Sequence, residues 1–358
     1  MTLQPQNPEK REIRAKPEIK DLTAEQLADW FHQHGVRKFR VSQVLKWIYL
    51  HQVENFEQMT DLSRGTRALI ADHFSLNRLK IQKTEISRDG SKKYLFQLHD
   101  GNLIESVLIP EKNHDTLCIS SQVGCAQGCH FCLTAHGGLT RNLSAGEIIS
   151  QVNDIKHDRD STGKLTNIVL MGMGEPLANY TNVVNALKMI TDGNVGLKIS
   201  SRRVTLSTAG LVPNLARLGK DIQVNLAISL NATENKTRDW LMPLNRKYPI
   251  EKLLAACADY PLQNRRKITF EYILIKGVND TPEDAQRLAR LLRPIRAKIN
   301  LIPFNVHAES PFQCPDEDTI LRFQGILLEK SYTVIIRRSK GGDISAACGQ
   351  LRARSLRP

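Results

Sequence analysis

Residues 116–132 read TLCISSQVGCAQGCHFC, and this stretch decides how the rest of the chain is interpreted. It opens with a short apolar strand, predicted over Thr116–Ser121, and ends in a loop that carries Cys125, Cys129 and Cys132. The C-x3-C-x2-C spacing, in a chain whose N-terminal residues contain no apolar signal segment, indicates metal or redox chemistry rather than disulfides. We therefore predict a metal-bearing loop at the carboxyl end of a strand.

Beyond this stretch the chain alternates between strand and helix patterns. Strands are predicted at Asn167–Met173, Arg203–Thr208, Val224–Leu230, Ile268–Ile275 and Lys298–Phe304. Helical periods separate them, at 144–156, Tyr180–Ile190, Pro249–Asp259, Pro282–Leu292 and Asp316–Lys330. Six such units with right-handed crossovers predict an α/β fold, a partial (β/α)6 barrel, since a closed barrel needs eight. Tyr332–Arg338 is a candidate for one further strand.

Two smaller regions precede this barrel. A capping-box pattern at Thr23–Gln26 opens a helical unit, and Asp-Gly pairs at 89–90 and 100–101 separate three strand patterns. The predicted domains are a flexible tail at 1–20, a helical accessory domain at 21–78, an antiparallel β extension at 79–114, the barrel at 115–331 and a C-terminal strand and loop at 332–358.

Composition narrows the class of protein. The chain has 358 residues, of which 41% are hydrophobic, so it can fill a core and is not wholly disordered. No run approaches the ~20 apolar residues of a membrane helix, and we expect a cytoplasmic protein. The formal net charge of +13 fits either a polyanionic partner such as nucleic acid or a merely solubilising surface.

The three loop cysteines leave two metal chemistries open. Three thiolates can bind three irons of a [4Fe–4S] cluster and leave the fourth iron free for a substrate. A zinc site would need a fourth ligand, for which His130 or His136 is available. The first alternative predicts an iron–sulfur enzyme, and the second a non-catalytic, zinc-stapled RNA-binding protein.

The cysteine loop, with Phe131 beside its last cysteine, resembles that of radical S-adenosylmethionine (SAM) enzymes. The resemblance implies that the free iron of the cluster binds SAM. It further implies that Gly174 and Glu175 hold the methionyl amine. Contacts to the carboxylate, ribose and adenine are implied for Ser207, Ser229, Leu230, Asn231 and Asn305. Without the resemblance, these short motifs would be interpreted as ordinary exposed turns capped by Ser or Asn.

Four further motifs resemble the RlmN family of RNA methyltransferases. They are NLIESVLIP at 102–110, CISSQ at 118–122, GMGEPL at 172–177 and AACGQL at 346–351. The resemblance implies methylation of adenosine carbon 2 in the peptidyl transferase region of 23S rRNA and in tRNAs 3′ of the anticodon. A Cfr-like enzyme, which methylates carbon 8, is the nearest alternative, and Pro176 and Ile104–Pro110 favour RlmN.

The family resemblance assigns three catalytic roles and two SAM molecules per turnover. Cys348 would carry the methyl group as S-methylcysteine and become crosslinked to RNA, and Glu105 would accept the proton from carbon 2. Cys118 would then form a transient disulfide with Cys348. Without the resemblance, all three would be interpreted as ordinary strand or core residues. We assign core packing to Cys257 and a loop position to Cys314.

The resemblance also implies partners. These are 23S rRNA, tRNA and an electron donor such as flavodoxin or ferredoxin, and we expect a monomer. The helical unit around Trp47 is similar to the family's accessory RNA-binding element, and the C-terminal Arg352, Arg354 and Arg357 are candidate phosphate contacts. Asn231 stands where many members carry His, which leaves its contact with SAM open.

Overall fold

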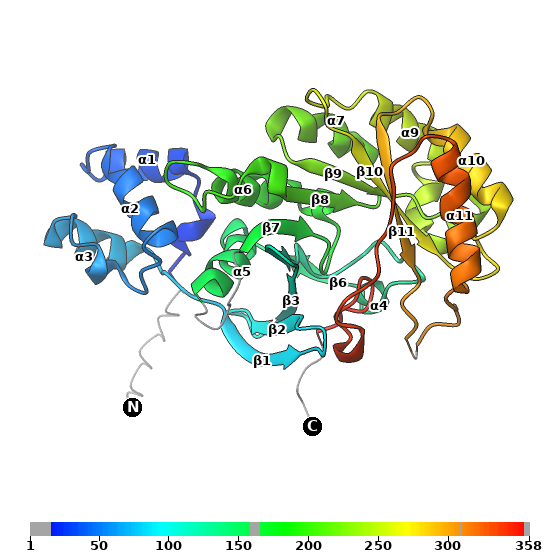
Figure 1. The fold of residues 1–358 in the computed structure, drawn as a ribbon. Helices are drawn as coiled ribbons and strands as arrows, with labels where there is room; N and C mark the ends of the chain where they lie inside the picture. Colours follow the sequence, from blue (N-terminus) through cyan, green and yellow to red (C-terminus); the bar gives the residue numbers. More distant parts are fainter. Residues whose placement is uncertain (1–15, 158–164, 308, 354–358) are drawn as a thin grey trace, which may run out of the picture.

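The structure is a computed structural model that describes residues 16–157, 165–307 and 309–353 (Figure 1). Within these residues, ten strands form one sheet in the order β1-β2-β3-β4-β7-β8-β9-β10-β11-β12, of which β4 and β7 to β12 are parallel. The parallel strands are β4 (Asp115–Cys118), β7 (Leu165–Leu170), β8 (Val204–Thr208), β9 (Asn225–Ser229), β10 (Ile268–Leu274), β11 (Ala297–Pro303) and β12 (Val334–Ile336). The six predicted barrel strands are confirmed, and the candidate further strand is β12.

The antiparallel strands continue the barrel sheet. They are β1 (Lys80–Ile86), β2 (Lys92–Gln97) and β3 (Leu103–Pro110), and β3 pairs with β4. Asp89 and Asp100 each accept a hydrogen bond from the backbone two residues on, which stabilises the predicted turns. The extension at 79–114 is therefore built into the barrel wall and is not separate from it.

A small hairpin carries the cysteine loop and was not predicted. Strand β5 (Gln122–Gly124) pairs with β6 (Leu139–Asn142), with the short helix α4 (Leu133–His136) between them. The strand predicted through Ser121 ends at Cys118. A Cβ at Gly124 would lie 2.0 Å from the carbonyl oxygen of Gly138, so the hairpin closes here only with glycine.

Helices cover the outside of the parallel sheet (Figure 1). They are α5 (Ala145–His157), α6 (Tyr180–Thr191), α7 (Val212–Asp221), α8 (Asn235–Leu241), α9 (Ile250–Ala258), α10 (Pro282–Leu292) and α11 (Glu317–Glu329). The short 3-10 helices are Ile19–Asp21, Phe56–Gln58, Pro176–Asn179, Ser201–Arg203, Pro243–Arg246 and Gly342–Ile344. Helix α8 was missed because it is short and rich in polar residues, and α7 because Pro213 and Gly219 interrupt its helical pattern.

Side chains alternate along the parallel strands, with apolar ones under the helices and polar ones inside the barrel. Ile168, Leu206 and Phe270 are fully buried in the main core. Their neighbours Asn167, Thr205 and Thr269 face the barrel interior, where they line a cavity. Barrel interiors are usually packed with branched aliphatic residues, so this polar interior leaves room for a ligand.

The N-terminal helices pack against α5. Helices α1 (Ala24–Gln33), α2 (Arg40–Tyr49) and α3 (Arg64–His73) form this unit, and the Thr23 capping box is confirmed. Asp21 accepts a hydrogen bond from the Gly146 backbone at 2.7 Å, and Lys20 donates one to Ser150 at 2.6 Å. Residues 1–15 of the predicted tail lie outside the described residues. Ile19 and Lys20 are buried, so the ordered chain begins before residue 21.

The segment after β12 closes the barrel against its other edge. The Gly341 backbone donates to Asp89 at 2.7 Å, and Lys93 donates to the Ile344 carbonyl at 2.7 Å. The C-terminal chain therefore crosses from β12 to the β1–β2 hairpin (Figure 1). Arg354 and Arg357, predicted to contact phosphates, lie outside the described residues. In the described part of the chain, the helices are all too short or too polar to cross a membrane.

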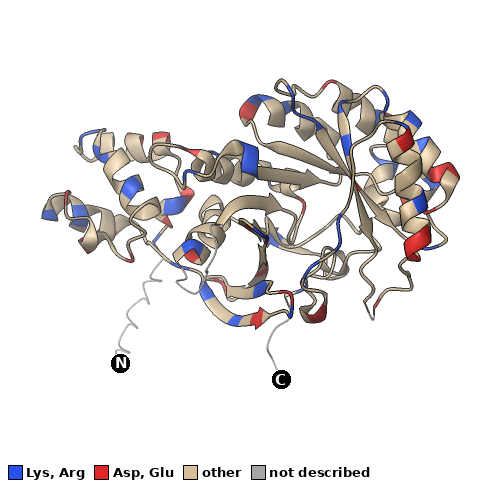
Figure 2. Ribbon diagram, in the orientation of Figure 1, with Lys and Arg blue, Asp and Glu red and all other residues tan. Residues whose placement is uncertain are grey.

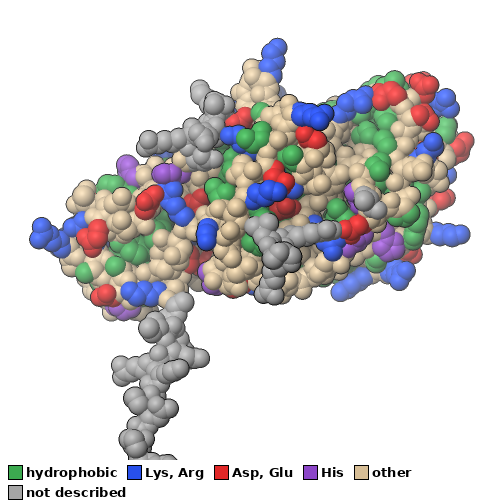
Figure 3. Space-filling view, turned by 90° about the horizontal axis from the view of Figure 1, so that it is seen from below, with side chains coloured by type: hydrophobic (Ala, Val, Ile, Leu, Met, Phe, Trp, Pro, Cys, Tyr) green, Lys and Arg blue, Asp and Glu red, His purple; other side chains and the backbone are tan. Residues whose placement is uncertain are grey.

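Charge does not segregate onto one face. Figure 2 shows Lys and Arg on the N-terminal helices, the outer helices and the C-terminal segment, with Asp and Glu among them. The face seen from below carries the same mixture (Figure 3). The net charge of +13 therefore does not by itself identify an RNA-binding surface.

Candidate active site

The three loop cysteines lie together at the carboxyl ends of the barrel strands. Cys125, Cys129 and Cys132 line one cavity of about 140 Å³, which we call the cofactor chamber. Burial raises the pKa of Cys125 to about 12 and the pKa of Cys129 well above its ordinary value, and neighbouring cysteines add to the rise in Cys129. Such thiols ionise only with a cation, and metal binding releases their protons. Three thiols on one loop fit the ligand set of an iron–sulfur cluster with one free iron.

A zinc site would be built differently. It needs four ligands around one ion. Among the residues that the structure describes, no three His, Cys, Asp or Glu side chains are grouped as ligands of a single ion. In a cubane cluster each thiolate binds a different iron, so its cysteines need not meet at one point. His130 and His136, the candidate fourth ligands, are exposed.

Glu175 lies in the cofactor chamber but also joins two strand ends. Its Oε1 accepts hydrogen bonds from the Leu177 backbone at 3.0 Å and the Thr208 hydroxyl at 2.7 Å. Its Oε2 accepts one from the Ala209 backbone at 2.8 Å. Burial raises the pKa of Glu175, and these donors oppose the rise. A carboxylate has about four acceptor positions, and these hydrogen bonds from the described residues fill three of them.

The neighbouring glycine is needed for the fold as well as for a ligand. Gly174 has φ of 100°, and a Cβ there would lie 2.6 Å from the Cβ of Gln122. Gln122 in turn accepts a hydrogen bond from the Glu175 backbone at 2.8 Å. The family resemblance implied only a contact of this glycine with SAM, and the structure adds close packing against β5.

The other predicted SAM contacts divide into two groups. Ser207, Ser229 and Asn231 line the cofactor chamber, whereas Leu230 is buried outside it. Asn231 has φ of 59°, which Asn tolerates better than most residues. Its Oδ1 accepts a hydrogen bond from the Ile273 backbone at 2.9 Å, and its Nδ2 donates to the Met242 sulfur at 3.3 Å. The Asn231 side chain thus ties β9 to β10.

Asn305 contacts the loop of Cys348 rather than the cofactor chamber. Its Nδ2 donates a hydrogen bond to the Cys348 carbonyl at 3.1 Å. The same loop is fixed to the cysteine loop, because the Leu133 backbone donates to the Gly349 carbonyl at 2.7 Å. Cys348 and Gly349 themselves line the cofactor chamber. The fold therefore brings Cys348 beside the three loop cysteines, more than 200 positions earlier in the chain.

Cys118 lies in β4, next to this arrangement. Burial raises the pKa of its thiol to about 12, negative charge on Cys348 adds to the rise, and the Arg337 cation opposes it. Negative charge on Cys348 in turn raises the pKa of Arg337. The two cysteines predicted to react are thus close enough to interact electrostatically, with one arginine acting on both. All seven cysteines are free thiols. Cys257 is buried in the core as expected.

Glu105 lies in β3, outside the two cavities that Cys348 lines. Its Oε2 accepts a hydrogen bond from the Arg352 backbone at 2.8 Å, and its Oε1 lies 3.4 Å from the Lys93 ammonium. Burial raises the pKa of Glu105, and Lys93 opposes the rise. This carboxylate is therefore attached to the chain four residues after Cys348.

Sequence reasoning missed two charged residues of the site. Arg238 is fully buried and donates to the carbonyls of Ala209, Ser229 and Leu230 at the ends of β8 and β9. Glu271, the one carboxylate in the apolar strand ITFEYIL, lies inside the barrel. A lone charge in an apolar strand was the signal for Glu271, whereas Arg238 lies in an unpredicted helix.

A partial parallel barrel with three loop cysteines above its strands defines a radical SAM enzyme. The family model described as the radical SAM superfamily matches residues 119–292, and that of the ribosomal RNA large subunit methyltransferase N-terminal domain matches residues 17–76. A crystal structure of a radical SAM methyltransferase from Sphaerobacter thermophilus superposes with a TM-score of 0.88. It is 42% identical and covers 94% of this chain and 100% of its own.

Curated relatives define the family more narrowly. The dual-specificity RNA methyltransferase RlmN of Desulfosudis oleivorans is 59% identical, over 94% of this chain and 91% of its own. The RlmN of Geotalea uraniireducens is 51% identical, and the match covers 95% of this chain and 97% of its own. This chain belongs to the RlmN family of radical SAM RNA methyltransferases. Membership implies a [4Fe–4S] cluster, SAM and an RNA substrate.

Proposed function

We propose that this enzyme methylates carbon 2 of adenosine in two kinds of RNA. The targets are the peptidyl transferase region of 23S rRNA and the adenosine 3′ of the anticodon in tRNAs. Each turnover would use two SAM molecules, one for the methyl group and one for radical chemistry. The observation that carries the proposal is the position of Cys348, which lines the same chamber as Cys125, Cys129 and Cys132.

The loop cysteines would hold the cluster, and Glu175, Ser207, Ser229 and Asn231 would contact SAM. When bound, the cluster and SAM supply the methyl group and the radical that activates it. Glu175 offers its remaining acceptor position to the methionyl amine, while its other hydrogen bonds keep β7 and β8 in register. Leu230 would support this edge of the chamber, since its N–H donates to the Glu271 carbonyl and its carbonyl accepts from Arg238. Gly174 allows the turn that presents Glu175.

Cys348 would act as the nucleophile that receives the methyl group and as the link to the base. Methylation of an unactivated aromatic carbon needs a carbon radical, and a methyl group on sulfur can provide one. Asn305 and Leu133 hold the backbone at and just after Cys348 through the Cys348 and Gly349 carbonyls. A fixed backbone keeps the sulfur at one position for both steps.

Release of the product needs a base and a second thiol. Glu105, with its pKa raised by burial, would take the proton from carbon 2. Loss of this proton together with one electron, for which the cluster would be the acceptor, restores the aromatic base. The Cys118 thiolate would then bond to the Cys348 sulfur, the bond from that sulfur to the RNA-linked methylene carbon would break, and this carbon would take up a proton to become the methyl group, leaving a disulfide. An external reductant must restore both thiols, and an electron donor such as flavodoxin or ferredoxin must reduce the cluster. These needs fit a reducing, cytoplasmic setting.

The test is one anaerobic turnover experiment. Reconstituted enzyme, SAM, a reductant and an RNA hairpin with an unpaired adenosine are incubated, and the nucleosides are identified by mass spectrometry. We expect 2-methyladenosine and about four irons per chain. Cys348→Ala should abolish product, whereas Cys314→Ala, which removes a half-buried loop thiol, should not. A product of 8-methyladenosine would indicate Cfr-like activity, and a zinc-bound, iron-free protein would refute the iron–sulfur assignment.

A further inference from the structure

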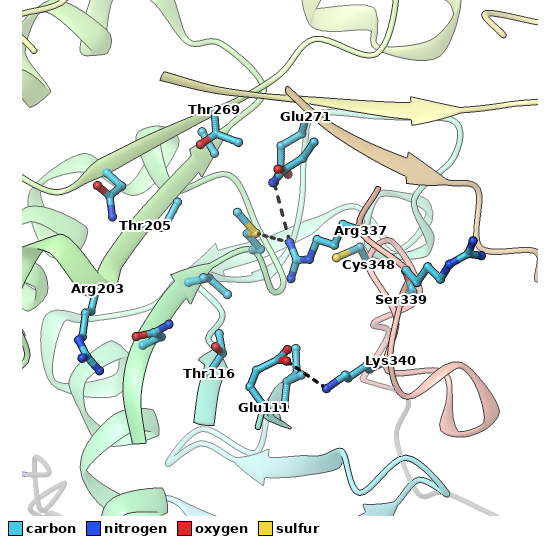
Figure 4. A pocket seen from close by; sticks show the side chains of 18 of the residues that line it. Glu111, Thr116, Arg203, Thr205, Thr269, Glu271, Arg337, Ser339, Lys340 and Cys348 are labelled. Carbon is cyan, nitrogen blue, oxygen red and sulfur yellow. Dashed lines mark hydrogen bonds and ion pairs between the residues drawn. The ribbon is translucent and has the colours of Figure 1, made fainter. Parts of the chain in front are cut away.

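The barrel interior holds two cavities, one behind the other. The cofactor chamber contains Ser207, Ser229 and Ile273. A second cavity of about 370 Å³ is lined by residues two to four positions earlier on the same strands (Figure 4). We call it the amino-terminal chamber, and its inward-facing residues are Thr116, Asn167, Thr205, Asn225, Thr269 and Asn300. Because side chains alternate along a strand, both cavities belong to one continuous row of inward-facing positions.

Three residues border both cavities. They are Met171, Glu271 and Cys348. Figure 4 shows Cys348 and Arg337 on one side of the amino-terminal chamber and Arg203 on the other. Cys348 therefore separates the cofactor from a second, differently lined space. A residue that takes a group from one ligand and passes it to another needs access to both.

The amino-terminal chamber is polar and positively charged. Six cationic side chains line it, against two carboxylates: Arg202, Arg203, Lys298, Arg337, Arg338 and Lys340, with Glu111 and Glu271. Arg337 and Lys340 face these carboxylates at 3.8 and 3.4 Å. Arg202, Arg203 and Lys298 make no side-chain hydrogen bond or ion pair within the described part of the chain. These three charges are available for an anionic ligand.

The wall also contains a buried acceptor that lacks a hydrogen bond. Glu271 is 7% exposed, and its Oε1 lies 3.8 Å from the Arg337 guanidinium but accepts no hydrogen bond within the described residues. A buried carboxylate oxygen without a donor is costly, so this oxygen fits a ligand that supplies an N–H group. The exocyclic amine of adenine is such a donor. Cations at the rim and an acceptor inside suit a nucleotide, with its phosphate outside and its base inside.

We propose that the amino-terminal chamber seats the target nucleotide, so that RNA enters the barrel from the end opposite the cofactor. Arg202, Arg203 and Lys298 hold the RNA phosphates at the rim, and the unstacked base reaches Cys348 from the amino-terminal side. The chamber volume of about 370 Å³ lies within the ~300–1,000 Å³ of small-ligand sites. The enzyme acts on a base that must leave its stack. This inference rests on the proposed function.

The test measures the reaction of Cys348 with SAM and the binding of RNA in separate assays. We compare wild type with two double variants. One is Arg202→Ala/Arg203→Ala, and the control is Arg290→Ala/Arg293→Ala, which removes two exposed arginines at the end of α10. Methylation of Cys348 is measured by peptide mass spectrometry without RNA, and binding of an RNA hairpin with an unpaired loop adenosine is titrated at several salt concentrations. Thr205→Tyr, which fills the amino-terminal chamber, is tested in parallel.

The proposal predicts normal Cys348 methylation in all variants, which also shows that they fold and bind SAM. RNA affinity should fall roughly tenfold per rim arginine at low salt. The salt slope should fall by about 0.7 for each RNA phosphate that a variant no longer neutralises. Thr205→Tyr should lose RNA methylation. Rim variants that bind RNA like the α10 control, with the same salt slope, would overturn the proposal. Absence of RNA methylation by wild type would refute the proposed function, while the binding comparison would still decide where RNA enters.

Discussion

Arg238 holds the strand ends that carry the predicted SAM contacts, and Arg238→Met should destabilise both the fold and this site. The guanidinium is fully buried and donates to four acceptors. They are the Leu230, Ala209 and Ser229 carbonyls and the Asn245 side chain, at 2.9, 2.8, 3.1 and 2.9 Å. Methionine has similar length but no donor, so these buried acceptors would lose their partner.

The magnitude follows from two opposing effects. Each hydrogen bond from a charged donor contributes about 1.5–3 kcal/mol. Burial opposes the charge and lowers the pKa of Arg238 to about 10, so part of this gain is offset. Each buried acceptor left without a donor costs about 1–3 kcal/mol, and removal of the buried charge offsets part of that sum, which leaves a net loss of about 3–5 kcal/mol. For 358 residues, an unfolding entropy of about 2.1 cal/mol/K per residue gives a fall in Tm of about 4–7 °C.

The assay is thermal unfolding under anaerobic conditions, together with SAM titration. Arg290→Met, on the exposed side of α10, is the matched control and should change Tm by less than about 1 °C. Arg238→Lys keeps the charge but lacks the planar fork, so its Tm should fall between the two. SAM affinity should weaken with Arg238→Met, because Ser229 and Ala209 lose their support. An Arg238→Met protein as stable as the control would refute this role.

Three further predictions concern single steps or contacts. Gly174→Ala should destabilise the protein and weaken SAM binding, because φ of 100° and a Cβ 2.6 Å from Gln122 are both unfavourable; equal Tm values would contradict this. Glu105→Gln should leave Cys348 methylation intact and accumulate the RNA crosslink on denaturing gels. In wild type the Glu105-dependent step should slow as pH falls through the raised pKa of this carboxyl, because only the carboxylate accepts a proton; a profile following an ordinary Glu pKa would argue against burial. Cys118→Ala should trap the same crosslink, and rapid multiple turnover without it would exclude Cys118 as the resolving thiol.

The sequence predicted elements whose signals are local. The capping box at Thr23 and strand patterns such as Ile268–Ile275 were sufficient, because each depends on neighbours in the chain. The β5–β6 hairpin was missed because its strands are short and its closure depends on the close approach of Gly124 and Gly138. The polar alternation in the parallel strands was present in the sequence. It was interpreted only as strand propensity, although it marks a barrel with a ligand space.

The candidate site shows the same division between local and spatial information. The C-x3-C-x2-C spacing located the cysteine loop, since ligand spacing within a loop is a sequence property. The hydrogen bonds of Glu175, Asn231 and Asn305 could not be predicted, because their partners Ala209, Ile273 and Cys348 lie 34, 42 and 43 positions away. Each side chain has a structural contact beside its predicted role. Loss of activity on mutation would not separate the two, whereas stability measurements would.

The position of Cys118 places opposing demands on the final step of the proposed reaction. Attack on Cys348 requires a thiolate, yet burial raises the pKa of the Cys118 thiol to about 12. The same burial protects this thiol from premature oxidation while RNA is absent. Arg337 is the cation that lowers the pKa of Cys118, and it also interacts with Cys348 and lies 3.8 Å from Glu271 in the wall of the amino-terminal chamber. A nucleotide bound there would change the surroundings of Arg337, so occupancy of the amino-terminal chamber and the pKa of the Cys118 thiol are coupled through this arginine.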